Sequence, residues 1–337
     1  MDSLTHVALG AAIGVGVMGR RTATWKAALW GAVAGNLPDL DVLIDHGDPI
    51  LDMVLHRAET HAPFWLTLAS LPLAALIARL NGEWALWRRW WLAIWLALVT
   101  HPLLDAMTVY GTQLALPFTN RPFGVGSIFI IDPLYTLPLL VGAGWALAGR
   151  GSRRSRIANA AGLALSTAYL GWGLAVQQHV ERVARDSLAA QGLGVERLLV
   201  TPTAFNSLLW RVVAVEGDRF HEGFYSLLDD TPRVAFDAFE RGATLAAELK
   251  DVDGVRRIAA FSGGFYKLSL DDRGQVLVTD LRMGQEPSYV FSFAVAERHS
   301  PPIALATPRR VGARIDLERG LPWLWRRLSG EPVPPSR

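Results

Sequence analysis

No cysteine occurs among the 337 residues of this chain. Disulfide bonds and thiolate metal ligands are therefore excluded, and any metal ion must be bound through nitrogen and oxygen. A basic arm is also missing, and the net charge of only +2 gives no support to nucleic-acid binding. Residues 1–6 lack the basic region of a cleavable signal peptide, so we expect residue 1 to be the mature start.

Apolar residues are abundant, above all in the first half. Hydrophobic residues make up 51% of the chain, its mean hydropathy is +0.23, and ten of its thirteen tryptophans precede residue 178. Four stretches approach the ~20 apolar residues that cross a bilayer, and two shorter ones are rich in Gly and Ala, which lets helices pack closely. The long stretches are 63–80, 90–107, 128–149 and 157–177, and the short ones are 4–19 and 24–36. We therefore predict a mainly α-helical membrane domain of about six transmembrane helices at residues 1–178.

Charged residues divide between the two ends of these predicted helices. The connections at 20–26, 79–89 and 150–156 hold ten of the twelve basic residues before residue 178, and alternation of six helices places all three on one side. The positive-inside rule makes that side cytoplasmic. Nine of the ten acidic residues in this half fall on the other side. We therefore expect a multi-pass membrane protein with an extracytoplasmic C-terminal domain.

The composition changes after residue 178. Residues 179–195 are predicted to form a linker helix, and short apolar runs separated by turn residues then predict antiparallel strands. The predicted strands are 197–201, 208–215, 224–228, 256–261, 266–270, 275–280 and 289–295, with a helix at 234–250. Together they predict a small soluble β-rich α+β domain at 196–325, followed by a tail at 326–337 whose composition predicts disorder.

Three short motifs place histidine and aspartate beside apolar segments. They are N-L-P-D-L-D at 36–41, H-R-A-E-T-H at 56–61 and H-P-L-L-D at 101–105. Counting helices puts all of them at the same membrane face, where ionisable groups are costly unless they have a partner or a function. The residues concerned are His6, Asp39, Asp41, His56, His61, His101, Asp105 and Asp132. We interpret the group as a metal centre at the outer face.

Each motif also has a simpler interpretation. Two carboxylates at i and i+2, as in Asp39 and Asp41, suit a hard or borderline cation, but a polar turn leaving the membrane also explains them. His101 and Asp105 lie one helical turn apart on the same face, and a buried hydrogen-bonded network would use them equally well. The two histidines of the second motif are five residues apart, which differs from H-E-x-x-H, so a zincin peptidase is not indicated.

Other polar residues accompany the motifs. Arg57 could clamp a phosphate or carboxylate bidentately, or it could pair with Glu59 or the aspartates. Glu59 could act as a general base or remain a solvated carboxylate. Asp132 could support the ligands or favour the start of a helix. Asn36 and Thr60 are further candidates for supporting the metal ligands.

These motifs, with D-S-L-T-H at 2–6 and the continuation of the third motif to residue 118, resemble the bacterial inner-membrane, metal-dependent hydrolases of the YdjM-like group. The resemblance covers roughly residues 1–150, with four separated motifs in order. Arg57 and Thr60 match an H-R-x-x-T-H pattern, whereas Ala58 and Ala62 stand where relatives often have Gly and Ser. The motif types are also distantly similar to those of zinc-dependent phospholipase C. The metal ligands that the resemblance implies are His6, Asp39, Asp41, His56, His61, His101 and Asp105.

The sequence thus predicts an integral-membrane metal-dependent hydrolase of the bacterial inner membrane, acting on a phosphoester of a lipid or lipid-linked substrate. Arg57 and Glu59 would be its catalytic residues. Histidine and carboxylate ligands favour Zn²⁺, or else Mn²⁺, over Ca²⁺ or Mg²⁺, and seven ligands allow one or two ions. Two alternatives remain open: a metal- or proton-linked transporter, and a membrane-anchored interaction protein with a structural metal site. Membrane lipids are the expected partners.

Overall fold

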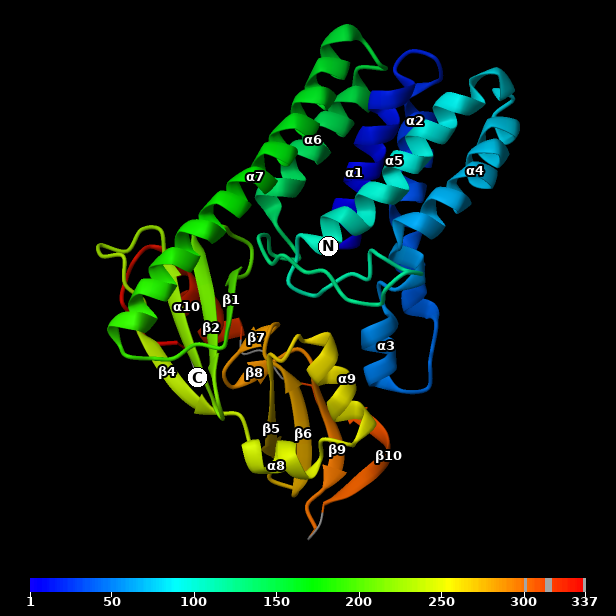
Figure 1. Cartoon of the computed structure of the whole chain (residues 1–337). Helices are drawn as coiled ribbons and strands as arrows, with labels where there is room; N and C mark the ends of the chain where they lie inside the picture. The colour runs from blue at the N-terminus through cyan, green and yellow to red at the C-terminus, as the bar shows by residue number, and fades with distance from the viewer. Residues whose placement is uncertain (300–301, 313–316, 336–337) are drawn as a thin grey trace. The chain divides into compact units, whose positions relative to one another are not determined.

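The chain forms two compact units in the computed structural model, which describes residues 1–299, 302–312 and 317–335 (Figure 1). Unit 1 is helical and unit 2 is rich in β-strands, so the predicted order of a helical region followed by a β-rich domain is confirmed. Unit 1 comprises Met1–Ile44, Leu55–Ala175 and Ala204–Asn206, and unit 2 comprises Asp45–Val54, Val176–Thr203 and Ser207–Arg337.

Apolar helices pack around one core in unit 1. Its largest fully buried side chains are those of Met18, Ile77, Trp90, Ile94 and Leu139. The helices are α1 (Ser3–Met18), α2 (Thr24–Asn36), α4 (Pro63–Leu80), α5 (Trp87–Ala106), α6 (Pro133–Ala148) and the first part of α7 (Arg153–Ala190), with the short 3₁₀ helices η1 (Pro38–Leu43), η2 (Glu59–His61) and η3 (Trp84–Leu86).

Helices α1 and α2 approach so closely that glycine is required where they cross. A Cβ atom added at Gly10 would lie 2.2 Å from the carbonyl oxygen of Gly31, and one added at Gly14 would lie 2.1 Å from that of Ala27. At Gly35 it would lie 2.7 Å from the carbonyl oxygen of His6. Small residues at such spacings allow backbones to pack directly in membrane helices. The tight hairpin expected of these two helices is therefore present.

One described helix, α4, is long and apolar enough by composition to cross a membrane, whereas α1 and α6 are apolar but shorter. Sixteen residues rise about 24 Å, which is less than the ~30 Å of a bilayer core. The stretch expected at 128–149 is shortened because the Asp132 carboxylate accepts hydrogen bonds from the N–H groups of Leu134 and Tyr135, so that α6 begins at Pro133. The structure shows one clear span in place of the predicted six.

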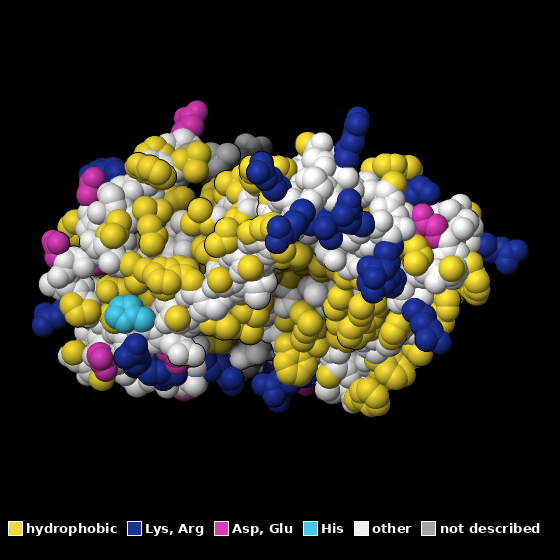
Figure 2. All heavy atoms as spheres, turned by 90° about the horizontal axis from the view of Figure 1, so that it is seen from above, with side chains coloured by type: hydrophobic (Ala, Val, Ile, Leu, Met, Phe, Trp, Pro, Cys, Tyr) yellow, Lys and Arg dark blue, Asp and Glu magenta, His cyan; other side chains and the backbone are white. Residues whose placement is uncertain are grey.

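The three basic connections of unit 1 meet at one end of the helices. The hydroxyl of Thr22, in the α1–α2 connection, donates to Glu83 in the α4–α5 connection at 2.6 Å, and Lys26 lies 3.6 Å from the same carboxylate. Gly151, in the α6–α7 connection, is so close to Thr24 that a Cβ would lie 2.7 Å from its hydroxyl. Figure 2 looks onto this end, where Lys and Arg side chains are gathered among hydrophobic ones. The grouping of basic connections that the sequence predicts is therefore present.

Unit 2 contains two four-stranded antiparallel sheets. In the first sheet the order is β1 (Arg197–Pro202), β2 (Leu209–Glu216), β3 (Arg219–Ser226), β4 (Phe236–Glu240). In the second it is β10 (Ile303–Arg310), β9 (Ser292–Glu297), β6 (Gln275–Asp280), β5 (Tyr266–Leu270). A small ribbon joins β7 (Gly284–Gln285) to β8 (Ser288–Tyr289), and the helices of this unit are α8 (Ala243–Glu248), α9 (Asp253–Phe261) and α10 (Leu317–Leu328).

Unit 2 also includes a segment from the first half of the chain. Residues 45–54, which begin helix α3 (Pro49–Leu55), fold with the β-rich unit. Ile50 is fully buried, and its Cδ1 atom lies 2.9 Å from where a Cβ would stand on Gly254 of α9. The segment therefore fills a position in the packing of unit 2, although its two ends continue into the motifs at 36–41 and 56–61.

Two secondary-structure predictions for unit 2 are wrong. The strand expected at 256–261 is part of helix α9, because Val255, Ile258 and Phe261 are buried at helical spacing. The helix expected at 234–250 contains strand β4, which pairs along β3, and only the short helix α8 beyond Gly242. Gly242 has φ +73°, a conformation that favours glycine and separates the two elements.

Helix α7 and the C-terminal tail also differ from expectation. The linker helix predicted at 179–195 is the end of α7, which continues without a break from Arg153 to Ala190. The tail predicted as disordered from residue 326 is packed: the Arg327 guanidinium contacts Asp229 and donates to the Phe224 carbonyl at 2.9 Å, and Val333 packs on a cluster that includes Trp323. Residues 336–337 lie outside the described residues.

Candidate metal centre

Four elements of unit 1 bring the predicted ligands together at the end opposite the basic connections. Helix α2 ends at Asn36, and Pro38 starts η1, which carries Asp39 and Asp41. The 3₁₀ helix η2 ends with His61. His101 and Asp105 lie one turn apart near the end of α5, and His6 lies in the first turns of α1. The close α1–α2 crossing brings Gly35 against the backbone of His6. This contact holds the end of α2, which leads into η1, beside α1.

Four ligand atoms converge on one point. Asp39 Oδ1, His61 Nε2, His101 Nε2 and Asp105 Oδ2 all lie within 4.8 Å of one another. The two Nε2 atoms are 3.1 Å apart. Asp39 Oδ1 lies 3.5 and 3.3 Å from the nitrogens of His61 and His101, and Asp105 Oδ2 lies 3.4 and 3.3 Å from them.

Five of the six separations among these four atoms match a tetrahedral ion, and the two carboxylate oxygens lie within 4.8 Å of each other. Zinc bonds of 2.0–2.1 Å to nitrogen and oxygen place neighbouring ligand atoms about 3.3 Å apart in a tetrahedron. The five separations above lie between 3.1 and 3.5 Å. In addition, Asp105 Oδ2 is buried and accepts no hydrogen bond from any described residue. A buried carboxylate oxygen needs a partner, and a cation held by these four atoms would provide one. The residues therefore fit a divalent metal ion.

Hydrogen bonds orient both imidazoles toward this point. His101 Nδ1 lies 2.7 Å from the Gly35 carbonyl oxygen, which can only accept, so Nδ1 carries the hydrogen and Nε2 keeps its lone pair for the cluster. His61 Nδ1 lies 2.9 Å from the hydroxyl of Thr60, which donates to Asp41 at 2.8 Å. Metal-binding histidines are commonly held in this way through their other nitrogen. Thr60 therefore links Asp41 to the imidazole of His61.

Three of the seven predicted ligands surround the four converging atoms. Asp41 accepts hydrogen bonds from Thr60 and from the backbone N–H of Arg57, and lies 2.8 Å from His56 Nδ1. His6 stacks on His101 at 3.6 Å between ring centroids, and its Nε2 lies 3.2 Å from Asp105 Oδ1. All seven residues are thus brought together, but only four supply atoms to the common point. This arrangement describes one ion more directly than two.

Arg57 is bound within the cluster. Its side chain is buried, with Nη2 3.2 Å from Asp105 Oδ1, Nη1 donating to the Thr108 hydroxyl at 3.3 Å, and the guanidinium 4.8 Å from the centre of the Tyr110 ring. Its backbone has φ +68°, a strained conformation for a side chain of this size. The pairing with an aspartate of the cluster, one of the two simpler interpretations, is therefore the one present.

The other predicted site residues lie apart from the four ligand atoms. Glu59 is exposed, and its carboxylate makes no hydrogen bond or ion pair with any described residue. Asp132 is buried, caps α6 and accepts a hydrogen bond from Tyr169 at 2.9 Å. Asn36 keeps its Oδ1 atom buried and without a partner among the described residues. Asp132 therefore has the helix-start role that the sequence left open.

Sequence reasoning missed Thr108, Tyr110 and the Gly35 carbonyl. Thr108 and Tyr110 follow the H-P-L-L-D motif within the run at 101–118. Their position directly after that motif is the sequence feature that could have identified them. Nothing in a residue's identity shows that its backbone carbonyl orients a histidine, so the role of Gly35 needs the folded chain.

A proton and a metal ion compete for His61. Burial lowers the pKa of His61, but its contacts with Asp105, Asp39 and Asp41 outweigh this and raise the pKa to about 9. The metal-free protein therefore holds a proton there at neutral pH, and metal binding must release it. This proton stabilises the metal-free fold below about pH 6.5, and the contribution is lost as the pH rises through about 9.

We therefore expect metal binding to strengthen as the pH rises. The apparent dissociation constant of Zn²⁺ should fall about tenfold per pH unit up to about pH 9, because one proton is displaced per ion. Competition titration with a chromophoric chelator at several pH values, after correction for the chelator's own protonation, would measure this slope. Calorimetry in buffers of different ionisation enthalpy should detect about one released proton near pH 7.5. A dissociation constant that does not change over this range would contradict the expectation.

A helical region that carries a histidine–aspartate centre and precedes a β-rich domain defines a membrane-type protein with a candidate metal site. The profile of the family described as "YdjM inner membrane protein" matches residues 1–180, and the chain belongs to this family. The chain is also 26% identical, over 308 residues, to "Uncharacterized protein YfhP" of Bacillus subtilis (strain 168), covering 86% of this chain and 89% of that protein. No solved structure matches it significantly. The predicted family is confirmed.

Proposed function

We propose that this protein is an integral-membrane, metal-dependent hydrolase that acts on a phosphoester of a lipid or lipid-linked substrate. The observation that carries the proposal is the convergence of one oxygen each from Asp39 and Asp105 with one nitrogen each from His61 and His101, all within 4.8 Å of one another. A divalent ion bound there would supply Lewis acidity and an activated water for ester hydrolysis. Zn²⁺ suits this donor set best, and Mn²⁺ next.

An apolar rim beside the ligands supports a lipid substrate. In η1 the ligand Asp39 and its neighbour Asp41 alternate with Leu40 and Val42, which are exposed, and Leu43 is 78% exposed. Phe118, which is 80% exposed, contacts the ring of Phe64 in the first turn of α4. Because α4 is the clear membrane span among the described helices, Phe118 and Phe64 would lie where lipid covers this helix. An amphiphile could then present its headgroup to the ligands.

Two residues receive supporting roles in this proposal. Arg57 holds Asp105 and contributes positive charge where a phosphoester gains negative charge during hydrolysis. Glu59, two residues before His61, is exposed and is the proposed general base. Asp41 and His56, whose side chains lie 2.8 Å apart, are the residues from which a second ion would draw ligands.

A transporter is the second candidate. The predicted ligands gather at one end of unit 1 while the basic connections occupy the other, which favours a localised site over a pathway through the midplane. His61→Ala separates the alternatives in reconstituted vesicles. Loss of phospholipid hydrolysis with normal insertion supports the hydrolase, and loss of metal or proton flux supports the transporter. No change in either would support an anchor with a structural metal site.

We expect Arg57→Lys to retain metal and lose activity. Lysine keeps the positive charge but cannot reach Asp105 and Thr108 at once as the planar guanidinium does. Hydrolysis of phospholipid vesicles should fall by about 10- to 1,000-fold, the range of one lost charge-stabilising contact. Arg121→Lys, at an exposed position, is the matched control and should be fully active. Nearly full activity in Arg57→Lys would remove the support for a phosphoester substrate.

The proposed topology is six membrane-embedded helices with the basic connections in the cytoplasm and unit 2 outside it. The sharp division of basic and acidic residues supports it. Reporter fusions after Arg156 and after Val195 should therefore report opposite sides of the membrane. A cytoplasmic signal from both fusions would rule out this arrangement.

A further inference from the structure

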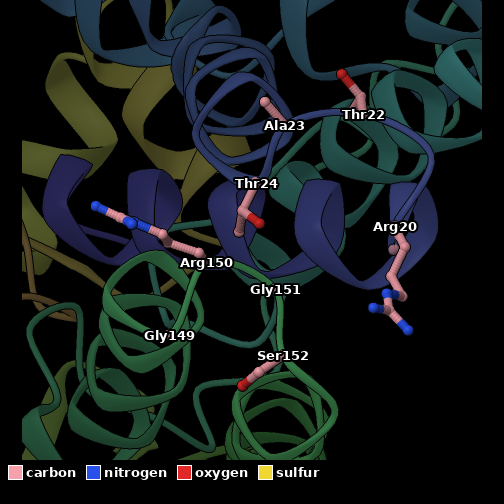
Figure 3. Close-up of a pocket in the computed structure, with 9 residues that line it drawn as sticks. Arg20, Thr22, Ala23, Thr24, Gly149, Arg150, Gly151 and Ser152 are labelled. Carbon is pink, nitrogen blue, oxygen red and sulfur yellow. The ribbon is translucent and has the colours of Figure 1, made fainter.

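A cavity of about 390 Å³ opens at the basic end of unit 1, between the α1–α2 and α6–α7 connections (Figure 3). Arg20 and Arg150 lie at its two rims with their side chains extending away from each other, and the hydroxyls of Thr24 and Ser152 lie between them. Gly151 keeps the two connections in contact, since any larger residue would collide with Thr24. Two positively charged side chains therefore flank a concave surface that carries hydroxyl donors and is formed by segments far apart in the sequence.

The arginines of this cavity have no internal partner. Neither Arg20 nor Arg150 forms an ion pair or hydrogen bond with any described residue, and both are exposed. The one carboxylate of these connections, Glu83, is engaged by Thr22, Lys26 and the indole of Trp90. In addition, the N-cap residue of α2, Ala23, makes no side-chain hydrogen bond to the first turn. Positive charge at this cavity is thus left for an external anion.

The surroundings of the cavity indicate a membrane interface. Trp25, which follows Thr24 in the first turn of α2, and Trp145, one turn before Gly149 at the end of α6, are each 58% exposed. Exposed tryptophan beside clustered arginine is typical of the level at which lipid headgroups lie. An anion that reaches this level attached to apolar chains is the phosphate of a phospholipid.

We propose that this cavity binds the phosphate of an anionic phospholipid, with Arg20 and Arg150 contacting its oxygens and the hydroxyl of Thr24 donating to it. Guanidinium groups suit phosphate because they donate through several N–H groups at once. The lipid would hold the α1–α2 and α6–α7 connections together at the end of unit 1 opposite the metal centre. The proposal does not depend on hydrolysis.

The test uses the full-length protein in detergent with phosphatidylglycerol, phosphatidylcholine or inorganic phosphate added. Native mass spectrometry counts the bound lipids, and thermal unfolding reports their effect. We expect phosphatidylglycerol to remain bound and to raise the melting temperature, while phosphatidylcholine and inorganic phosphate do so much less. Arg20→Ala with Arg150→Ala should weaken phosphatidylglycerol binding about 10- to 30-fold, since each basic side chain near the surface attracts anionic lipid.

Two further variants keep the test decisive. Arg79→Ala with Arg88→Ala removes the same charge from the α4–α5 end outside the cavity and should keep nearly normal binding. Thr24→Asp places a negative charge in the cavity at a helix start, where it does not destabilise the helix, and should abolish the lipid effect. Equal loss in both arginine pairs, or equal stabilisation by inorganic phosphate, would overturn the proposal.

Discussion

His61→Ala and His101→Ala should each lose nearly all bound metal. Each supplies one of the four converging atoms, and structural zinc sites release about 10–16 kcal/mol in total, or roughly 3 kcal/mol per ligand. Removing one ligand therefore weakens binding by roughly 100-fold or more. Elemental analysis of detergent-purified protein gives the stoichiometry, and competition with a chelator gives the dissociation constant.

Graded controls make this expectation specific. His56→Ala removes a residue that bonds Asp41 and contributes no atom to the converging set, so the loss should be nearer tenfold. His46→Ala changes an exposed histidine and should bind metal normally. Unchanged stoichiometry in His61→Ala, His101→Ala and Asp39→Ala together would reduce the cluster to a structural polar network.

Gly10→Ala should unfold unit 1 at a much lower temperature. The added methyl group would lie 2.2 Å from the Gly31 carbonyl oxygen, and backbone atoms cannot move away without separating α1 from α2. We expect a loss of about 3 kcal/mol or more, in the range of severe packing mutations. Gly31→Ala meets the Gly10 carbonyl at 2.1 Å and should behave alike. Thermal unfolding in detergent, followed by circular dichroism, measures the change.

The matched controls are glycines in helices of the same unit. Gly144 in α6 faces open space, so Gly144→Ala should be neutral or slightly stabilising, as alanine is in helices. A Cβ on Gly16 would meet only ordinary contacts, the nearest at 3.7 Å. If Gly10→Ala melts like these controls, the close approach of α1 and α2 is not what stabilises the pair. Because Gly35 abuts His6, metal content should fall together with stability in the damaging variants.

The first half of the fold could largely be predicted because its signals are local. Hydrophobic stretches, Gly spacing and the placement of basic residues all act within one helix or one connection, and the α1–α2 hairpin and the shared basic end follow from them. Helix boundaries could be predicted less well. The apolar run begins at residue 128, but α6 begins five residues later, at Pro133, with Asp132 as its N-cap. In unit 2, β4 is a strand because β3 lies beside it, which is information from elsewhere in the chain.

The candidate site shows the same division. The motifs, together with the family that they resemble, selected seven residues that do come together, because histidine and aspartate beside apolar segments need partners. Motif spacing could not show which atoms face the common point. The backbone of η1 and η2 was needed to show that Asp39 and His61 supply an atom to it and that Asp41 and His56 do not. The sequence likewise left two roles open for Arg57, and the folded chain was needed to place its guanidinium 3.2 Å from Asp105 Oδ1.

The burial of Ile50 against Gly254 has a consequence for biogenesis. Residues 45–54 join Asp41 to His56, yet the helix they pack on is made about two hundred residues later. During synthesis this connection has no partner until α9 has emerged from the ribosome and folded. The connection between the motifs at 36–41 and 56–61 is therefore packed late in synthesis. A chain stopped before α9 should therefore hold residues 45–54 without their packing partner, and limited proteolysis of this connection would detect that state.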